Sequence, residues 1–247
     1  QHPLYEDKGI ALLKTHYYGG VKKYQWVAMP LAMHGVVCKK DGTCVNVVIG
    51  EDPDDPVLGI TDLLPHLAAG QMEKPAAKII EGEEMNITFG TIPAKEEEKD
   101  AVKAAILTSL KEKYGIEEDD FMSAELEMVP AGPARDYGLD RSMVMGYGQD
   151  DRVCGYTSLM ALLDGGCQEK TTCCVLVDKE EVGSIGATGM HSMFFETAVM
   201  ELMELCGGYS ALNIRRCFNN SNMLSSDVSA AFDPTFQQVN EPMNTAY

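Results

Sequence analysis

Basic residues are scarce in this 247-residue sequence. It has 20 lysines and arginines against 38 aspartates and glutamates, which leaves a formal net charge of −18. Nucleic acids and anionic membrane surfaces are bound mainly through clustered positive charge. We therefore expect neither a nucleic acid nor a membrane surface as a partner. Hydrophobic residues make up 45% of the chain, the proportion typical of a soluble globular protein.

Long apolar runs and paired cysteine motifs are also missing. No stretch approaches the roughly 20 apolar residues that a membrane-spanning helix needs, and no signal-peptide pattern begins the chain. The eight cysteines form no C-x-x-C pair, and most lie in apolar stretches. This pattern predicts buried free thiols rather than disulfides, in a reducing compartment such as the cytoplasm.

Two adjacent glutamates, Glu180 and Glu181, follow an apolar run and precede a glycine-rich turn. The run, residues 171–177, predicts a strand buried on both faces of a parallel sheet. Residues 191–208 predict a long helix after the turn. Ligands of open α/β sheets bind just outside the carboxyl ends of strands, and the acid pair lies at such an end. Solvated loops also carry acid pairs, so this position alone does not establish a site.

Further acids occur at comparable places. Asp150 and Asp151 begin a predicted helix, and Asp227 lies beside an apolar stretch. Helix capping explains each one singly, but together with Glu180 and Glu181 they would repel one another unless a cation lies between them. A bridging carboxylate can hold two divalent cations about 3.5–4 Å apart. One glutamate would then bind a cation while its neighbour takes a proton from the attacking water.

The glycine-rich turn also allows a nucleotide-binding interpretation. Gly183, Gly186 and Gly189 follow the spacing G-x-x-G-x-x-G. A dinucleotide motif needs its glycines directly after the strand and a positive environment for the pyrophosphate. Here two glutamates intervene and would repel a phosphate, so the sequence favours the metal site.

Three acidic motifs carry a family resemblance. They are GYGQDDRVCGYTSL (146–159), VLVDKEEVGSIGATG (175–189) and LSSDVSAAFDP (224–234). In this order they resemble the aspartyl aminopeptidase and vacuolar aminopeptidase I family of dinuclear metallopeptidases. HYYGG, PLAMHG and LLPHLA resemble the family's β-rich inserted domain. The likeness covers essentially the whole chain.

The resemblance implies an α/β fold: a metallopeptidase catalytic core with a mainly parallel sheet, plus the inserted β-rich domain. Residues 1–15 would begin the catalytic domain, residues 16–134 would form the inserted oligomerisation domain, and residues 135–247 would continue the catalytic domain. Within the inserted region the residues themselves predict a β-hairpin around Asp41 and Gly42 and a helix over residues 94–115.

The same resemblance implies the roles of the site residues. Asp150 would bridge two divalent metal ions, zinc in preference to manganese or cobalt, and Glu181 and Asp227 would each bind one of them. Glu180 would be the general base. His66 would reach the active site of a neighbouring subunit in a homo-oligomer, although a packed or solvated histidine at a helix start fits it equally well. The activity implied is the removal of N-terminal residues from peptides.

Two departures from the family pattern are informative. The family's His-x-Asp motif and a second, C-terminal histidine are both missing, and neither is supplied by the five histidines His2, His16, His34, His66 and His191. We therefore expect the chain to be cut at both ends of a longer protein, with each metal short of one histidine. Weak or absent metal binding follows, and the alternative function is a catalytically inactive fragment with an assembly role.

Overall fold

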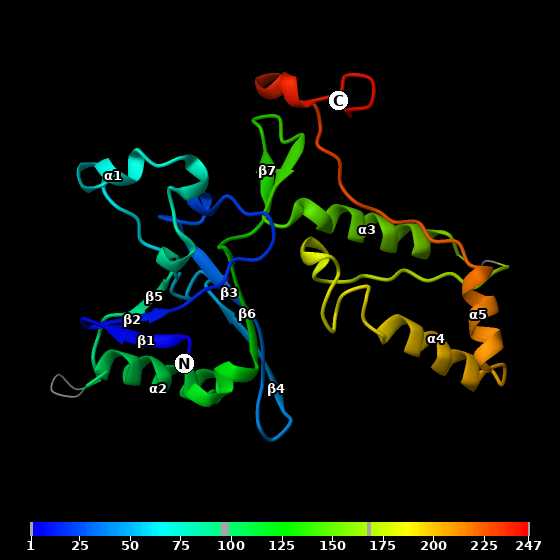
Figure 1. Cartoon of the computed structure of the whole chain (residues 1–247), viewed down its shortest axis with the longest axis horizontal. Helices are drawn as coiled ribbons and strands as arrows, with labels where there is room; N and C mark the ends of the chain where they lie inside the picture. Colours follow the sequence, from blue (N-terminus) through cyan, green and yellow to red (C-terminus); the bar gives the residue numbers. More distant parts are fainter. Residues whose placement is uncertain (1, 95–98, 167–168, 247) are drawn as a thin grey trace. The chain divides into compact units, whose positions relative to one another are not determined.

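The computed structural model describes residues 2–94, 99–166 and 169–246. Two compact units divide the chain, Gln1–Tyr147 and Gly148–Tyr247, and Figure 1 shows their elements. Helices and strands both occur, so the fold has mixed α and β content. Across the described ranges no helix is both long and apolar enough to span a bilayer.

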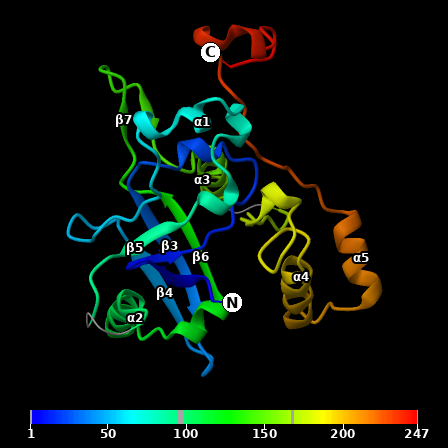
Figure 2. The same ribbon diagram turned by 60° about the vertical axis from the view of Figure 1, so that its left-hand side comes forward.

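The first unit begins with a small antiparallel sheet. Its strands are β1 (Leu4–Asp7), β2 (Ile10–Leu13) and β5 (Ile87–Gly90), in the order β1-β2-β5. Helix α2 (Ala101–Tyr114) contacts all three strands, as Figures 1 and 2 both show. The helix ends where Gly115 adopts a left-handed conformation, which confirms the predicted stop.

A second antiparallel sheet has the order β4-β3-β6. Strands β3 (Leu31–Cys38) and β4 (Cys44–Ile49) form the predicted hairpin around Asp41 and Gly42. Strand β6 (Ala124–Pro130) pairs with the other side of β3. Strands β7 (Arg135–Tyr137) and β8 (Met143–Met145) form a separate two-stranded sheet.

The buried core of the described residues lies almost entirely in this first unit. Its largest fully buried side chains are Leu4, Leu31, Met33, Ile87, Val37 and Val47. The buried side chains of both three-stranded sheets and of α2 form one cluster. Burying one such side chain contributes roughly 1.5–3 kcal/mol. The short helical segments that connect them are η1 (Lys23–Gln25), η2 (Pro65–Leu67), α1 (Ala69–Met72), η3 (Ala76–Lys78), η4 (Gly82–Glu84) and η5 (Glu118–Ser123).

The described part of the second unit is helical. Its elements are α3 (Gln149–Asp164), η6 (Glu180–Val182), α4 (Phe194–Leu205), α5 (Ala211–Asn219) and η7 (Pro234–Val239). Helices α4 and α5 contact each other through Phe195 and Phe218, whose ring centroids lie 6.0 Å apart. Ser210 caps α5 by accepting a hydrogen bond from the Asn213 backbone N–H.

The predicted parallel sheet is not formed by the residues that the structure describes. All named strands pair antiparallel, and the one parallel contact is an isolated bridge between Ala231 and Ala246. Residues 171–177 lie outside any strand. Val175, Leu176 and Val177 are 36%, 63% and 45% exposed. An apolar run becomes a buried strand only beside a partner strand, and the second unit's described residues provide none.

Two further expectations meet different outcomes. Within residues 1–15, expected at the start of a catalytic domain, Leu4–Asp7 and Ile10–Leu13 form β1 and β2, which join β5 in one sheet. The compact units divide at residue 147, so the division into inserted and catalytic domains stays a prediction. The prediction of buried cysteines is wrong for the seven that the structure describes, because all are exposed or half-buried. The eighth cysteine, Cys167, lies outside the described residues. The acids expected in the first turns of the helix, residues 96–98, lie outside them too.

Candidate metal centre

The first turn of α3 carries two adjacent carboxylates. Gly148, in a left-handed conformation, precedes the helix, and Asp150 and Asp151 have non-helical backbone angles inside its first turn. The peptide bond between the two aspartates is cis. Because these two residues have non-helical backbone angles, the regular helix begins only after the acid pair.

Asp227 joins this pair from a distant part of the same unit. It lies in the segment after α5, where its Oδ1 accepts a hydrogen bond from the Val228 N–H at 2.7 Å. One carboxylate oxygen from each of Asp150, Asp151 and Asp227 lies within 4.8 Å of the other two. Two like charges about 4 Å apart repel by roughly 1 kcal/mol even in water. The arrangement therefore favours a bound cation, and we call these three residues the aspartate cluster.

The surroundings of Asp151 fit a cation better than solvent. Its Oδ1 is buried and has no hydrogen-bond partner in the structure. A buried polar atom without a partner is costly, whereas a divalent cation would satisfy it directly. The donor set consists of carboxylate oxygens without a histidine. Oxygen ligands suit Mg²⁺, Ca²⁺ and Mn²⁺, while zinc sites usually include nitrogen or sulfur.

Cys154 lies one helical turn beyond the acid pair, and nearby carboxylates affect the pKa of its thiol. Its thiol pKa is raised, first because it hydrogen-bonds to Asp151 and further because of burial and the charges of Asp151 and Asp227; a hydrogen bond from Ser226 opposes the rise. The negative field of the aspartate cluster therefore reaches this thiol. Sequence reasoning did not single out Cys154, although its i, i+3 spacing from Asp151 on a helix gave the signal.

Glu180 and Glu181 lie on a separate turn of the same unit. They are the first two residues of η6 and both are exposed. The Glu180 carbonyl accepts hydrogen bonds from the N–H groups of Gly183 and Ser184 at 2.8 and 3.2 Å. Neither glutamate belongs to the aspartate cluster as the described residues form it. The structure thus brings together Asp150 and Asp227 of the predicted ligands and places the glutamates apart from them.

Backbone contacts close the glycine-rich turn on itself. The Asp178 N–H donates to the Thr188 carbonyl at 3.0 Å, and the His191 N–H donates to the Ser184 carbonyl at 3.2 Å. A Cβ atom on Gly189 would lie 2.2 Å from the Ser184 carbonyl oxygen. This glycine is therefore explained by the packing of the turn, without a phosphate. His191 is exposed and precedes α4, as expected of a residue near a helix N-terminus.

His66 belongs to the first unit, in the 3-10 helix η2, and is exposed. Leu63, Leu64 and Leu67, its neighbours in sequence, are 52%, 65% and 71% exposed, so the histidine is flanked by exposed apolar side chains. We call these four residues the His66 surface.

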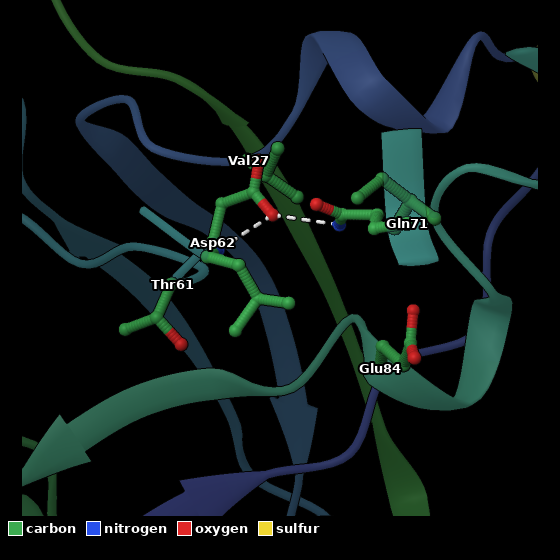
Figure 3. Close-up of a pocket in the computed structure, with 7 residues that line it drawn as sticks. Val27, Thr61, Asp62, Gln71 and Glu84 are labelled. Atoms are coloured by element: carbon green, nitrogen blue, oxygen red, sulfur yellow. Dashed lines mark hydrogen bonds between the residues drawn. The ribbon is translucent and has the colours of Figure 1, made fainter. Parts of the chain in front are cut away.

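A pocket lies in the same part of the first unit, as Figure 3 shows. It is lined by Val27, Thr61, Asp62, Leu63, Gln71, Ile80 and Glu84. The Asp62 Oδ1 accepts hydrogen bonds from the Gln71 side chain at 2.9 Å and from the Leu63 N–H at 2.8 Å. His66 itself does not line the pocket.

Comparison with known proteins identifies a family and several similar sequences. A family model described as aminopeptidase I zinc metalloprotease (M18) matches residues 1–247. A probable M18 family aminopeptidase 1 from Clostridium acetobutylicum is 63% identical over 248 residues, which cover 100% of this chain and 53% of that protein. Another from Thermotoga maritima is 46% identical over 247 residues and is covered to the same 53%. The chain thus spans about half the length of these curated relatives.

Solved structures that resemble this chain also include aminopeptidases, and the chain again covers about half of each. The crystal structure of an M18 family aminopeptidase from Thermotoga maritima superposes with a TM-score of 0.90 at 44% identity, covering 99% of this chain and 54% of that one. Aminopeptidase I from Clostridium acetobutylicum gives a TM-score of 0.87 at 60% identity, covering 100% and 53%. A dodecamer of mApe1 from S. cerevisiae shares the fold, with a TM-score of 0.63 at 19% identity. The match covers 95% of this chain and 52% of that one.

Proposed function

Because this chain belongs to the aminopeptidase I zinc metalloprotease (M18) family, we propose that the whole protein is a metal-dependent aminopeptidase that removes N-terminal residues from peptides. The aspartate cluster is the observation that carries this proposal. It offers three converging carboxylates and one buried oxygen without a partner. We propose two divalent ions there, zinc by family, with Asp150 as the bridge and Asp227 and Glu181 as further ligands.

The chemistry divides between the cations and the side chains. When bound, divalent cations would polarise the scissile carbonyl and lower the pKa of the attacking water. The Glu180 carboxylate takes a proton from that water and delivers it to the leaving amine, which is general acid–base catalysis. The carboxylates of Asp150 and Asp227 would hold the cations in position. Catalysis in this form requires the η6 turn to bring Glu180 and Glu181 close to the aspartate cluster.

A second candidate function, in assembly, rests on different observations. The aspartate cluster contains no histidine, so this chain is expected to bind zinc weakly and to turn over substrate poorly or not at all. The His66 surface exposes three leucines, as a subunit contact would. The mApe1 dodecamer shares only the fold at 19% identity, and we propose self-association of this chain through the His66 surface on the basis of its exposed side chains.

One assay separates the two functions. Hydrolysis of peptide amides is measured on this chain with Zn²⁺, Mn²⁺ or Co²⁺ and with a chelator. Metal-dependent turnover that Glu180→Gln reduces by about 10²–10⁴-fold, the range of general base catalysis, supports the peptidase. Glu204→Gln, at an exposed residue of α4, is the matched control and should retain activity. The absence of turnover with every metal supports the assembly function for this chain.

The compartment and the other partners are proposed on composition. Free thiols at the seven described cysteines fit the cytoplasm, where thiols stay reduced. A net charge of −18 fits a protein that binds neither nucleic acid nor an anionic membrane. The remaining partner is then the peptide substrate, besides a second copy of the chain.

A further inference from the structure

Two cysteines face each other at the tip of the β3–β4 hairpin. Cys38 is the last residue of β3, Cys44 is the first residue of β4, and the two are directly opposite in the strand register. Their Sγ atoms lie 3.0 Å apart, and both residues are exposed. The thiols are thus within hydrogen-bond distance of each other and accessible from solvent.

The hydrogen bonds of the hairpin define the geometry of this pair. The Lys39 N–H donates to the Thr43 carbonyl at 2.8 Å, and the Gly42 N–H donates to the Lys39 carbonyl at 3.0 Å. Gly42 has a φ of 85°, the left-handed conformation that such a turn requires. Hydrogen-bonded and non-hydrogen-bonded residue pairs alternate along an antiparallel ladder. Because Lys39 and Thr43 are joined by a hydrogen bond, the next pair, Cys38 and Cys44, is a non-hydrogen-bonded pair. Cα atoms in such pairs are about 4.5 Å apart, within the range that a disulfide can bridge.

The cysteine pair lies on the face of the sheet opposite the core. Side chains alternate along a strand, and the preceding residue, Val37, is fully buried. A bond between the two sulfurs would therefore leave the packing of the core unchanged. The pKa of Cys38 is raised, first because its thiol shares a hydrogen bond with Cys44, which agrees with a contact between the two sulfurs in their reduced form.

We propose that Cys38 and Cys44 are a redox modification site, a dithiol that a low-molecular-weight disulfide such as glutathione disulfide converts to an intrachain disulfide. One cysteine thiolate attacks the glutathione disulfide and releases one glutathione thiolate. The second cysteine thiolate then attacks the protein sulfur of the mixed disulfide and releases the other. The cysteines lose two protons and two electrons, and the oxidant becomes two molecules of glutathione.

The reaction joins the two strands next to a contact with η5. The Ser123 hydroxyl donates to the Cys38 carbonyl at 2.6 Å, and Lys40 forms an ion pair with Asp119 at 3.0 Å. These contacts hold the end of β3 and the turn of the hairpin in place before oxidation. The second, intramolecular step is favoured because the attacking sulfur is already positioned beside the mixed disulfide.

The test exposes the full chain to glutathione disulfide, quenches it with acid, alkylates the remaining thiols and digests it with trypsin. Trypsin cleaves after Lys39 and Lys40, so a disulfide between Cys38 and Cys44 appears as two tryptic peptides that separate on reduction. We expect this linked form to exceed the glutathione adducts at either cysteine by about ten-fold, because the closing thiol is preorganised. Cys38→Ser and Cys44→Ser should each give a stable glutathione adduct on the remaining cysteine.

The outcomes decide the proposal without relying on activity. A wild-type chain that carries glutathione adducts on Cys38 and Cys44 without the link overturns it, as does a link from either residue to another cysteine. Circular dichroism of the Cys38→Ser/Cys44→Ser double variant verifies that the fold persists. The vicinal pair Cys173 and Cys174 is the internal control. We do not expect a disulfide between these two cysteines to exceed their glutathione adducts.

Discussion

Glu6 in β1 caps α2 across 96 residues of sequence: its Oε2 accepts a hydrogen bond from the Val102 N–H at 2.9 Å. The Lys103 N–H donates to the same oxygen at 3.0 Å. Free N–H groups at a helix N-terminus need an acceptor, and here a strand provides it. The N-terminal strand and the helix that packs on it are thereby held together.

Removing this cap should destabilise the first unit. We expect Glu6→Ala to lower the free energy of unfolding by about 1–2 kcal/mol, the cost of losing a helix cap, and Glu6→Gln to lose less because it keeps an acceptor. Urea denaturation monitored by circular dichroism measures the change. The exposed neighbour Asp7→Ala is the matched control, and equal losses at both positions would contradict the capping role.

A pH-dependent contact lies between Asp55 and Lys113, 2.9 Å apart. The pKa of Asp55 is lowered, first by the hydrogen bond from Lys113 and then by that from the Gly50 N–H. Because the folded pKa lies below the unfolded one, the contact stabilises the fold above the ordinary pKa near 3.8, and this stabilisation is lost as the pH falls through the folded pKa. Wild type should therefore exceed Asp55→Asn in thermal unfolding midpoint at neutral pH.

The difference between these two proteins should shrink as the pH falls below about 4 and the Asp55 carboxylate takes up its proton. Thermal unfolding at several pH values measures it. A difference that stays constant down to the lowest pH at which both proteins still fold would show that the charge of Asp55 plays no part.

The aspartate cluster should bind a divalent cation, with Mn²⁺ at least comparable to Zn²⁺ because every ligand in it is an oxygen. Calorimetric titration measures the affinity directly. Asp150→Asn and Asp227→Asn should each weaken binding by about ten-fold or more, since even indirect disturbance of ligands costs 10–100-fold. Asp233→Asn, in the same segment but outside the cluster, should bind as wild type does. Equal affinity in all variants would exclude this site.

The turn after Glu180 and Glu181 depends on Gly189. We expect Gly189→Ala to destabilise the second unit by about 3 kcal/mol, because the new Cβ would overlap the Ser184 carbonyl and force the backbone to move. Gly208→Ala in the same unit is the control, since its Cβ meets nothing closer than 3.9 Å. Proteolysis within residues 178–191 measures the opening of the turn, and equal protection in both variants would contradict the close packing.

The His66 surface should mediate self-association. Leu67→Asp places a charge on a 71%-exposed leucine beside His66, and we expect it to shift the chain towards monomer. Ile92→Asp, at a residue that is 80% exposed in the same unit, should leave association unchanged. Light scattering at micromolar concentration measures both. A strictly monomeric wild type would contradict the assembly proposal.

Local sequence signals predicted local structure well. The Asp41-Gly42 turn and the Gly115 helix end both occur as expected, because each depends on a few adjacent residues. The family resemblance led us to expect Asp150, Glu180, Glu181 and Asp227 to converge, and of these four the aspartate cluster contains Asp150 and Asp227. The inclusion of Asp151 was not expected, since adjacency in sequence does not tell which of two carboxylates turns towards a third.

Non-local pairing was the part that sequence could not determine. The apolar run at residues 171–177 indicated burial, but a run does not identify the strand beside it. The cysteines were predicted to be buried because they occur in apolar stretches. At the hairpin tip, alternation from Val37 directs Cys38 to the solvent face instead, and this could have been derived from the predicted turn.

The unpaired segment at residues 171–177 has a practical consequence for handling the protein. Exposed Val175, Leu176 and Val177, with no neighbouring strand in the described part of the second unit, resemble the unprotected edges on which intermolecular β-structure grows. The net charge of −18 keeps molecules apart, and salt weakens that repulsion. The chain should therefore remain dispersed in dilute buffer and precipitate progressively as ionic strength rises.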